Sequence, residues 1–349
     1  MRIATLTLNP ALDRTVYCEN VGAGKLNRAV SPSVLTHGGK GTNVSCVLKI
    51  FGAESTAYGF VGGGEENNNG KLFKKLLAPY KIKHDFTETK CDTRLNIKVI
   101  DKYGEPTEFN EPGGLINPDE KQDLLNKIKN IISDGVDLFF MGGSVPPGIE
   151  KSIYRDIIDL DKDNRTKFIL DCDGEALRLC MENKNKPYMI KPNQFELEQY
   201  TGKKFELGNN FVGRGDPDAP SGFDEVLEEI EEEAKKIYNK TGVIVLCTLG
   251  EYGALYCGSE GAFYKNAPKV EVRGFTGAGD TFLAAFCMVY FGLPGDFSAP
   301  FREGGVRRAR VAESALGYAV AASAAKVTKP GTQFAAVEEV EAMRERVNN

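Results

Sequence analysis

One short segment combines small residues with a single carboxylate in an arrangement suited to phosphate chemistry. The sequence GFTGAGD spans residues 274–280 and precedes an apolar stretch, 281–291, that predicts a helix. The first turn of a helix has unpaired N–H groups that can bind an anion, and Gly277 and Gly279 let the anion approach the backbone. A carboxylate repels an anion, so Asp280 is either a helix-capping residue or a general base for a hydroxyl attacking a bound phosphoryl group.

A second glycine cluster, HGGKGTN at 37–43, precedes another predicted helix. Lys40 is followed by Gly41, so the cluster does not have the spacing of a Walker P-loop. No G-x-G-x-x-G follows the first predicted strand, which speaks against the usual dinucleotide-binding fold. Taken alone, the cluster indicates either a tight turn into a helix or a place where a ligand hydroxyl approaches the backbone.

The elements that position these clusters alternate between strands and helices. Short runs that are apolar on both faces predict strands at 138–141, 168–170 and 242–247, each ending at Gly, Asp or Thr. Apolar residues at helical spacing predict helices at 119–132 and 224–240. This order predicts an α/β fold with a mostly parallel central sheet and helices on both faces. Ligands of such sheets bind at the carboxyl ends of the strands, where Asp171 ends one strand and opens toward a helix at 175–179.

Three segments interrupt the alternation. Residues 11–36 and about 88–113 have shorter, alternating patterns, including a hairpin whose first strand is 95–100 and whose turn is 101–104. We expect these two excursions to form a small β-sheet appendage. Residues 203–223 are rich in Gly, Asn, Asp and Pro and are expected to form a surface insertion. The whole chain, 1–349, is predicted to be one domain with this appendage.

Composition excludes several classes of protein. The 349 residues include 44 Lys and Arg against 49 Asp and Glu, so the net charge of −5 argues against non-specific binding of nucleic acid. Only two histidines are present, and the eight cysteines contain no C-x-x-C, so a histidine-rich zinc site is not expected and the cysteines are expected to be free thiols. The longest apolar run, 282–291, is too short to cross a bilayer. We expect a soluble, cytoplasmic protein with no membrane partner.

Taken together, the motifs resemble those of the PfkB (ribokinase-like) carbohydrate kinases, especially the branch of bacterial 1-phosphofructokinases and tagatose-6-phosphate kinases. The resemblance covers nearly the whole chain and rests on motifs in one order: TLTLNPALD at 5–13, GGKGTN at 38–43, TRLN at 93–96, GSVPPG at 143–148, KPNQFE at 191–196, TLGEYG at 248–253, GAGD at 277–280 and KPGT at 329–332. It implies a ribokinase-like fold whose small β-sheet is a lid over the sugar. Such lids often pair with the lid of another subunit, so a homodimer through the lid is an expectation.

The resemblance also implies a role for each matching residue. Asp280 would be the catalytic base, in an anion hole formed by Gly277, Ala278 and Gly279. ATP would contact Lys191, Asn193, Glu196, Thr248, Leu249, Gly250, Gly253 and Gly279, with Asn193 and Glu196 acting on Mg²⁺ indirectly through phosphate and water. The sugar hydroxyls would be held by Asp13, Gly39 and Asn43, and the sugar phosphate by Lys25, Lys40, Arg94 and Ser144. A solvated surface cation is the ordinary alternative for each Lys or Arg.

The segment TEFNEPG at 107–113 resembles the lid strand of 1-phosphofructokinases, which favours fructose 1-phosphate as acceptor and its 6-hydroxyl as the attacking group. Tagatose 6-phosphate or fructose 6-phosphate, attacking through the 1-hydroxyl, is the alternative substrate. A neutral-sugar or nucleoside kinase, and a non-catalytic sensor of sugar phosphates or nucleotides on the same fold, are alternative functions. Many ribokinase-like proteins have a monovalent-cation site near GAGD; here Gly274, Phe275 and Thr276 depart from the usual residues, which leaves that cation open.

Overall fold

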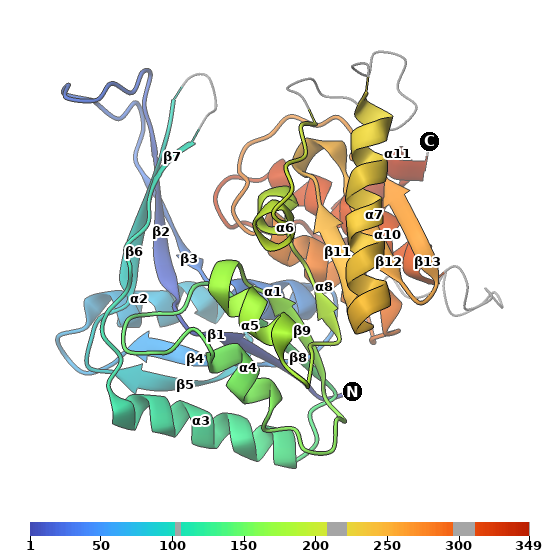
Figure 1. Cartoon of the computed structure of the whole chain (residues 1–349). Coiled ribbons are helices and arrows are strands. Elements are labelled where there is room, and N and C mark those ends of the chain that lie inside the picture. Colours follow the sequence, from blue (N-terminus) through green and yellow to red (C-terminus); the bar gives the residue numbers. More distant parts are fainter. Residues whose placement is uncertain (102–105, 208–221, 296–310, 349) are drawn as a thin grey trace.

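A large sheet forms the centre of the protein in the computed structural model, which describes residues 1–101, 106–207, 222–295 and 311–348 (Figure 1). Within these residues nine strands lie in the order β13 (Gly261–Lys265), β12 (Ala254–Gly258), β11 (Ile244–Thr248), β10 (Met189–Ile190), β9 (Lys167–Asp171), β8 (Leu138–Gly142), β1 (Ile3–Thr7), β4 (Thr56–Gly62) and β5 (Lys83–Thr89). Neighbours from β11 to β5 are parallel, and β12 and β13 are added antiparallel. The predicted mostly parallel sheet is confirmed.

Side chains of the central strands alternate between two cores because successive residues of a strand point to opposite faces. In β8, Phe139 and Met141 pack into one core, whereas Leu138 and Phe140 pack into the other. The first core is completed by α3 (Pro118–Ser133), α4 (Ile153–Ile158), α5 (Gly174–Glu182), α6 (Gln194–Thr201) and α7 (Phe223–Thr241), and the second by α1 (Lys40–Ile50), α8 (Ala278–Tyr290), α10 (Val311–Val327) and α11 (Val337–Asn348). Helices therefore cover both faces, as predicted.

A separate four-stranded sheet projects from the main body (Figure 1). Its order is β3 (Val34–Gly38), β2 (Ala11–Tyr17), β6 (Arg94–Ile100) and β7 (Pro106–Phe109), so both predicted excursions contribute strands. The pairing of β2 with β6 places Asp13 opposite Asn96. The turn residues 102–105 and most of the predicted insertion, 208–221, lie outside the described residues.

Several local features complete the description of the fold. Helix α3 begins with a capping box in which Asn117 and Glu120 satisfy each other's backbone N–H groups. Helix α2 (Asn68–Leu77) packs against β4 through a third apolar cluster that includes Phe73 and Leu77. All eight cysteines are free. None of the described helices has both the length and the apolar character needed to cross a bilayer.

Candidate active site

The predicted site residues gather where the main sheet meets the first turns of three helices. Asp171 is the last residue of β9, Lys191 directly follows β10, and Thr248 is the last residue of β11. Parallel strands end at one edge of a sheet, so these side chains are brought together although 77 positions separate the first from the last. Helices α1, α6 and α8 begin near this edge and carry the glycine clusters and the 193–196 motif.

Asp280 lies in the first turn of α8, where its side chain is only 8% exposed. The helix begins three residues earlier than the apolar pattern alone indicated, because Gly277 acts as its N-cap with φ +83°. No side chain caps this helix, so the capping role considered for Asp280 is excluded. Instead, Asn43 Nδ2 of α1 donates a hydrogen bond of 2.7 Å to Asp280 Oδ2. This hydrogen bond connects the two glycine clusters, 37–43 and 274–280.

The surroundings of Asp280 raise its pKa to about 6, chiefly because burial disfavours the charged form and because the Asp171 carboxylate is near. The Asn43 hydrogen bond and the positive charges of Lys40 and Lys191 act in the opposite direction and limit the shift. A carboxyl group with this pKa is mainly ionised at neutral pH and can still take up a proton. Those are the properties that a general base needs.

Asp171 is the centre of a buried charge cluster beside Asp280. Its Oδ1 accepts a hydrogen bond of 2.6 Å from Lys40 Nζ, and its Oδ2 lies 3.2 Å from Lys191 Nζ. Burial would raise the pKa of Asp171, but the two lysines outweigh burial and lower it. Burial would likewise lower the pKa of Lys40, but Asp171 and Glu196 reverse that effect and raise it. The cluster therefore holds two fixed positive charges near the first turn of α8.

The glycine turn leaves space next to one of these charges. A methyl group built on Gly279 would lie at the ordinary contact distance of 3.4 Å from Lys191 Nζ, so the space between the helix backbone and the ammonium group is about the size of a methyl group. Gly277 has a positive φ, and a methyl group there would lie 3.1 Å from Phe334. Backbone N–H groups at the start of α8 and the Lys191 ammonium together form a place for an anion.

The 193–196 motif is a second capping box. Asn193 Oδ1 accepts from the Glu196 N–H at 2.9 Å, and Glu196 Oε2 accepts from the Asn193 N–H at 2.8 Å. The other carboxylate oxygen, Glu196 Oε1, takes no part in the capping box and lies 3.8 Å from Lys40 Nζ. The described part of the chain has no group of three or more acidic, histidine or cysteine side chains suited to a metal ion. One available carboxylate oxygen fits an Mg²⁺ ion that keeps most of its water and phosphate ligands.

The 248–253 loop lies next to this capping box, because Thr248 pairs with Asn193 in an isolated parallel bridge. Thr248 N–H donates to the Pro192 carbonyl at 3.0 Å, and Leu249 is buried beneath the loop. Gly250 and Gly253 both have positive φ, and any Cβ at Gly253 would collide with the Lys265 carbonyl. The loop is thus held in one shape by positions that only glycine fills without strain.

On the side of the small sheet, Asp13 is buried and accepts a hydrogen bond of 3.0 Å from Asn96 Nδ2. Burial raises the pKa of Asp13, opposed by that hydrogen bond and by the charges of Lys98 and Arg94. A methyl group on Gly38 would lie 2.3 Å from Asp13 Oδ2, so the backbone before α1 passes directly beside this carboxylate. Gly39, the N-cap of α1, has φ +139° and is equally restricted to glycine.

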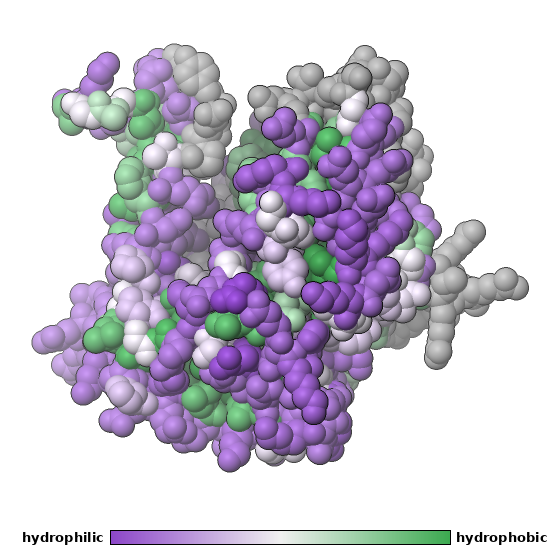
Figure 2. Space-filling model, viewed as in Figure 1, coloured by the Kyte–Doolittle hydropathy of each residue, from purple (hydrophilic) through white to green (hydrophobic). Residues whose placement is uncertain are grey.

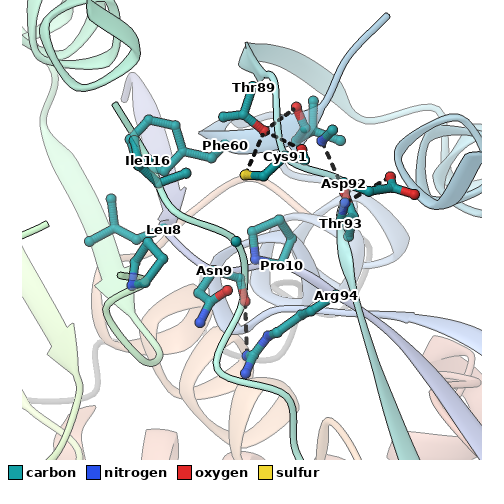
Figure 3. A pocket seen from close by; sticks show the side chains of 14 residues that line it. Leu8, Asn9, Pro10, Phe60, Thr89, Cys91, Asp92, Thr93, Arg94 and Ile116 are labelled. Atoms are coloured by element: carbon teal, nitrogen blue, oxygen red, sulfur yellow. Dashed lines mark hydrogen bonds between the residues drawn. The ribbon is translucent and has the colours of Figure 1, made fainter. Parts of the chain in front are cut away.

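Arg94 links the small sheet to the main body. Its two terminal nitrogens donate to the carbonyls of Glu111 and Asn9 at 2.7 and 3.0 Å, and one of them lies 3.3 Å from Ser144 Oγ. Asn9 Nδ2 donates to the same hydroxyl at 3.0 Å. Figure 3 shows Arg94 reaching toward the Asn9 backbone. Arg94 and Ser144, both assigned to the sugar phosphate from the sequence, are therefore close enough to contact one ligand.

Two adjoining cavities, of about 310 and 420 Å³, both include Arg94, Asn110 and Ser144 in their walls. The first is also lined by Asp13, Asn96, Lys98 and Glu108, and the second by Lys151 together with loop residues of 111–149. Lys25 lines neither cavity and lies in the exposed segment between β2 and β3.

The sequence prediction missed Asn96 and Lys98. The alternation of β6 was a usable signal, because residues 94, 96 and 98 of one strand share a face. Asn9 and Asn110 stood in the TLTLNPALD and TEFNEPG motifs without being given a role, whereas Lys151 lies in a turn and carried no comparable signal.

This geometry joins an anion-binding helix start, a buried base and a polar cavity beneath a small sheet. Residues 7–339 match the model of the pfkB family of carbohydrate kinases. The chain belongs to this family. As a family member, it is an enzyme that transfers phosphate to a sugar hydroxyl.

Two curated relatives of this pfkB kinase are the 1-phosphofructokinase of Borreliella burgdorferi, 33% identical over 82% of this chain and 84% of the relative, and that of Bacillus subtilis, 32% identical over 81% of this chain and 84% of the relative. Among solved structures, phosphofructokinase-2 of Escherichia coli in complex with potassium superposes with a TM-score of 0.77. It is 26% identical and the match covers 100% of this chain and 99% of that one. The predicted family and ribokinase-like fold are confirmed.

Proposed function

We propose that this enzyme transfers the γ-phosphoryl group of ATP to the 6-hydroxyl of fructose 1-phosphate, giving fructose 1,6-bisphosphate and ADP. The observation that carries the proposal is the position of Asp280, which is buried in the first turn of α8 and hydrogen-bonded to Asn43. The names of the relatives support the acceptor, since both are 1-phosphofructokinases.

In the proposed reaction, the Asp280 carboxylate takes the proton of the 6-hydroxyl group while the oxygen of that hydroxyl group bonds to the γ-phosphorus. The bond from that phosphorus to the β–γ bridging oxygen breaks, and ADP leaves with the electron pair. Negative charge on the transferred group is stabilised by the N–H groups of the Gly277–Gly279 turn and by Lys191. Lys40 was assigned to the sugar phosphate from the sequence; its contacts with Asp171 and Glu196 support a place nearer the transferred phosphate.

We assign the nucleotide to the side of the sheet formed by β11 and α6. The Thr248–Gly253 loop, including Leu249 and Gly250, would form one wall for ATP. Asn193 and Glu196 would hold water ligands of an Mg²⁺ ion. When bound, that ion supplies positive charge that neutralises the phosphate oxygens.

We assign the sugar to the cavities beneath the small sheet. Arg94 and Ser144 would hold the 1-phosphate, because a guanidinium group matches a phosphate with two parallel hydrogen bonds. Asp13, Gly39 and Asn43 would hold hydroxyl groups between that phosphate and Asp280. The small sheet would act as the lid, and its closure would exclude water from the γ-phosphate. Lys25 would reach the sugar phosphate only from such a closed position or from another subunit.

The lid is also our proposed site of homodimerisation. Exposed apolar side chains gather on it, namely Val21 at 38%, Leu26 at 78%, Val30 at 64% and Phe109 at 60% exposure. Figure 2 shows apolar atoms along this projecting arm. We also propose a cytoplasmic location, supported by the eight free thiols, which suit a reducing compartment.

A panel of acceptors tests the function. ADP release is measured with fructose 1-phosphate, fructose 6-phosphate, tagatose 6-phosphate, ribose and adenosine, each with ATP and Mg²⁺. We expect the highest kcat/KM with fructose 1-phosphate. Preference for one of the 6-phosphates would favour the alternative kinase, preference for ribose or adenosine would overturn the phosphate pocket, and ligand binding without ADP release would indicate a sensor.

Arg94→Ala and Arg94→Lys give the matched control for the phosphate pocket. If Arg94 binds the sugar phosphate, we expect the KM for fructose 1-phosphate to rise by roughly tenfold or more in both variants, since a lysine keeps the charge but not the bidentate geometry. An unchanged KM would assign Arg94 only to its backbone contacts with Asn9 and Glu111.

A further inference from the structure

Lys326 is a buried cation next to the glycine turn, and it has no part in the chemistry described above. It lies near the end of α10, a helix rich in alanine, and its side chain is 0% exposed. Its ammonium group donates to the carbonyl oxygens of Gly331 at 2.7 Å and Gly274 at 3.1 Å, and lies 3.5 Å from that of Lys329. All of these oxygens are backbone dipoles and none carries a full charge.

No carboxylate within the described residues forms an ion pair with Lys326. Burial lowers its pKa to about 8, helped by the charge of Lys98 and opposed by that of Asp280. Burying an ammonium without a counter-ion is unfavourable, and replacing it by an apolar side chain would remove that cost. A positive charge at this position therefore calls for a reason other than stability.

The carbonyl groups around Lys326 come from the two segments that fix the glycine turn. Gly274 begins the GFTGAGD segment, and Lys329 and Gly331 belong to the loop after α10. The backbone N–H groups of Arg273 and Gly274 both donate to the Val327 carbonyl, at 2.7 and 3.1 Å. The loop after α10 is tied in turn to the other glycine cluster, because Thr332 Oγ1 donates to the His37 carbonyl at 3.1 Å.

Lys326 also lies beside the turn, since a methyl group built on Gly277 would be at the ordinary contact distance of 3.8 Å from Lys326 Cε. A ring of backbone carbonyls around one positive charge is the environment in which proteins bind potassium. Here the ammonium of the chain itself occupies the ring, so the carbonyls do not fit an additional K⁺ ion. Phosphofructokinase-2 of E. coli, a solved structure with the same fold, was determined in complex with potassium.

We infer that the Lys326 ammonium is a built-in monovalent cation, which holds the Gly277–Gly279 turn in its anion-binding shape and makes turnover independent of K⁺. Lys326 is a positioning residue in this inference, because it acts through the turn and not on the substrate. The inference rests on the kinase function proposed above. In this inference the Lys326 side chain supplies the positive charge between the carbonyl groups that a dissolved monovalent cation would otherwise supply.

The test compares wild type with Lys326→Ala and Lys326→Met in the chlorides of K⁺, NH₄⁺, Na⁺ and choline at one ionic strength. Wild-type kcat is expected to be the same in all four salts. Lys326→Ala empties the ring, so its kcat in choline chloride should fall by roughly 10²-fold through misplacement of the turn, and K⁺ or NH₄⁺ should restore much of it. Lys326→Met fills the space without charge, so it should lose activity and gain nothing from K⁺.

Thermal unfolding provides a readout that needs no sugar substrate. K⁺ should raise the unfolding midpoint of Lys326→Ala relative to choline and leave that of wild type unchanged, even if fructose 1-phosphate is the wrong acceptor. Activation of the wild type by K⁺ would overturn the inference, as would a Lys326→Ala variant that keeps full activity in choline chloride. If Lys326→Ala does not fold, the inference is tested by the salt dependence of the other two proteins. Activation of the wild type by K⁺, or full activity of Lys326→Met, would then overturn it.

Discussion

Two buried carboxyl groups lie in one cluster, and their pKa values are shifted in opposite directions. Asp171 contacts both Lys40 and Lys191, and the lysines lower its pKa despite burial. Asp280 has an amide as its hydrogen-bond partner, and burial raises its pKa to about 6. Opposite shifts of this kind separate a permanent charge from a group that exchanges protons. At the scale of single residues, these shifts support our proposal that Asp280 is the base, while Asp171 is the counter-charge that contacts the two lysines.

Replacing Asp280 by Asn tests the base. A general base contributes about 10²–10⁴-fold, so kcat should fall by that order, whereas the KM for fructose 1-phosphate should change little. The folded-state pKa of Asp280 lies above the ordinary carboxyl value of 3.8, so ionisation of this group opposes folding at pH 8. The Asn variant should unfold at a temperature at least as high as wild type at pH 8. Near-normal turnover in a folded variant would contradict the assignment.

The same carboxyl group sets the acid limb of the pH profile. Because the base must be ionised, kcat/KM should be flat above about pH 6 and fall tenfold per pH unit below it. The measurement is the initial rate from pH 5 to pH 8 at constant ionic strength, with the stability of the enzyme checked at each pH. A profile that stays flat down to pH 5 would place the limb nearer the ordinary carboxyl value of 3.8 and show that Asp280 is not desolvated as described.

At the scale of elements, the first turn of α8 has a sequence that favours the proposed anion site over the stability of the helix. Helix α8 has no side-chain cap and begins with glycine, alanine and glycine, although its later residues are almost entirely buried and apolar. Glycine inside a helix is less stable than alanine by roughly 0.5–1 kcal/mol. The apolar contacts of α8 with α1 and α10 hold the helix in place despite this weak beginning.

Gly279→Ala separates function from stability at this helix. The backbone of Gly279 is helical, and the added methyl group would meet Lys191 Nζ at an ordinary contact distance of 3.4 Å. We expect an unfolding temperature equal to or higher than that of wild type, and a kcat/KM lower by roughly tenfold or more because the methyl group occupies the place of the phosphate. A stable variant with unchanged activity would show that no phosphate approaches Gly279.

Much of the element order could be predicted because each element is encoded locally. The apolar runs of β8, β9 and β11 and the helical spacing of α3 and α7 specify these elements within a few residues. The start of α8 was placed three residues too late, because helix propensity disfavours glycine and the pattern began only at residue 281. A positive φ at Gly277 depends on tertiary contacts that no local pattern contains.

The candidate site was predictable as a set of residues but not as a set of contacts. Asp280 and Asn43 stood in recognisable motifs, yet their hydrogen bond spans 237 positions and follows from the packing of α1 on α8. The pairing of Asp171 with Lys40 spans 131 positions and was equally hidden. Lys326 gave no signal at all, since one lysine near the end of an alanine-rich helix is indistinguishable from a solvated one.

At the scale of the whole molecule, the proposed sugar site lies between the main body and the projecting sheet. Asp13 and Arg94 belong to the small sheet, whereas Ser144 and Asn43 belong to the main body. Relative movement of the two parts would therefore change the site, and anything that fixes the small sheet would affect binding. The small sheet has exposed apolar residues, and we propose that the small sheet of another subunit packs against them.

Leu26→Glu tests this dimer. Leu26 is 78% exposed on the lid, so a charge there should disfavour an apolar interface without affecting the fold of a single chain. We expect wild type to sediment as a dimer at micromolar concentration and the variant to sediment as a monomer. Leu115→Glu is the matched control, because Leu115 is 70% exposed but lies outside the small sheet. A monomeric wild type, or an equal effect of both substitutions, would contradict the proposed interface.

The most direct test of the proposed reaction is identification of the product by ³¹P NMR with each sugar phosphate supplied separately. With fructose 1-phosphate and ATP, we predict new resonances of fructose 1,6-bisphosphate and ADP in equal amounts, at a rate well above that with fructose 6-phosphate. ATP consumption without a bisphosphate, or a bisphosphate formed only from fructose 6-phosphate, would contradict transfer to the 6-hydroxyl of fructose 1-phosphate.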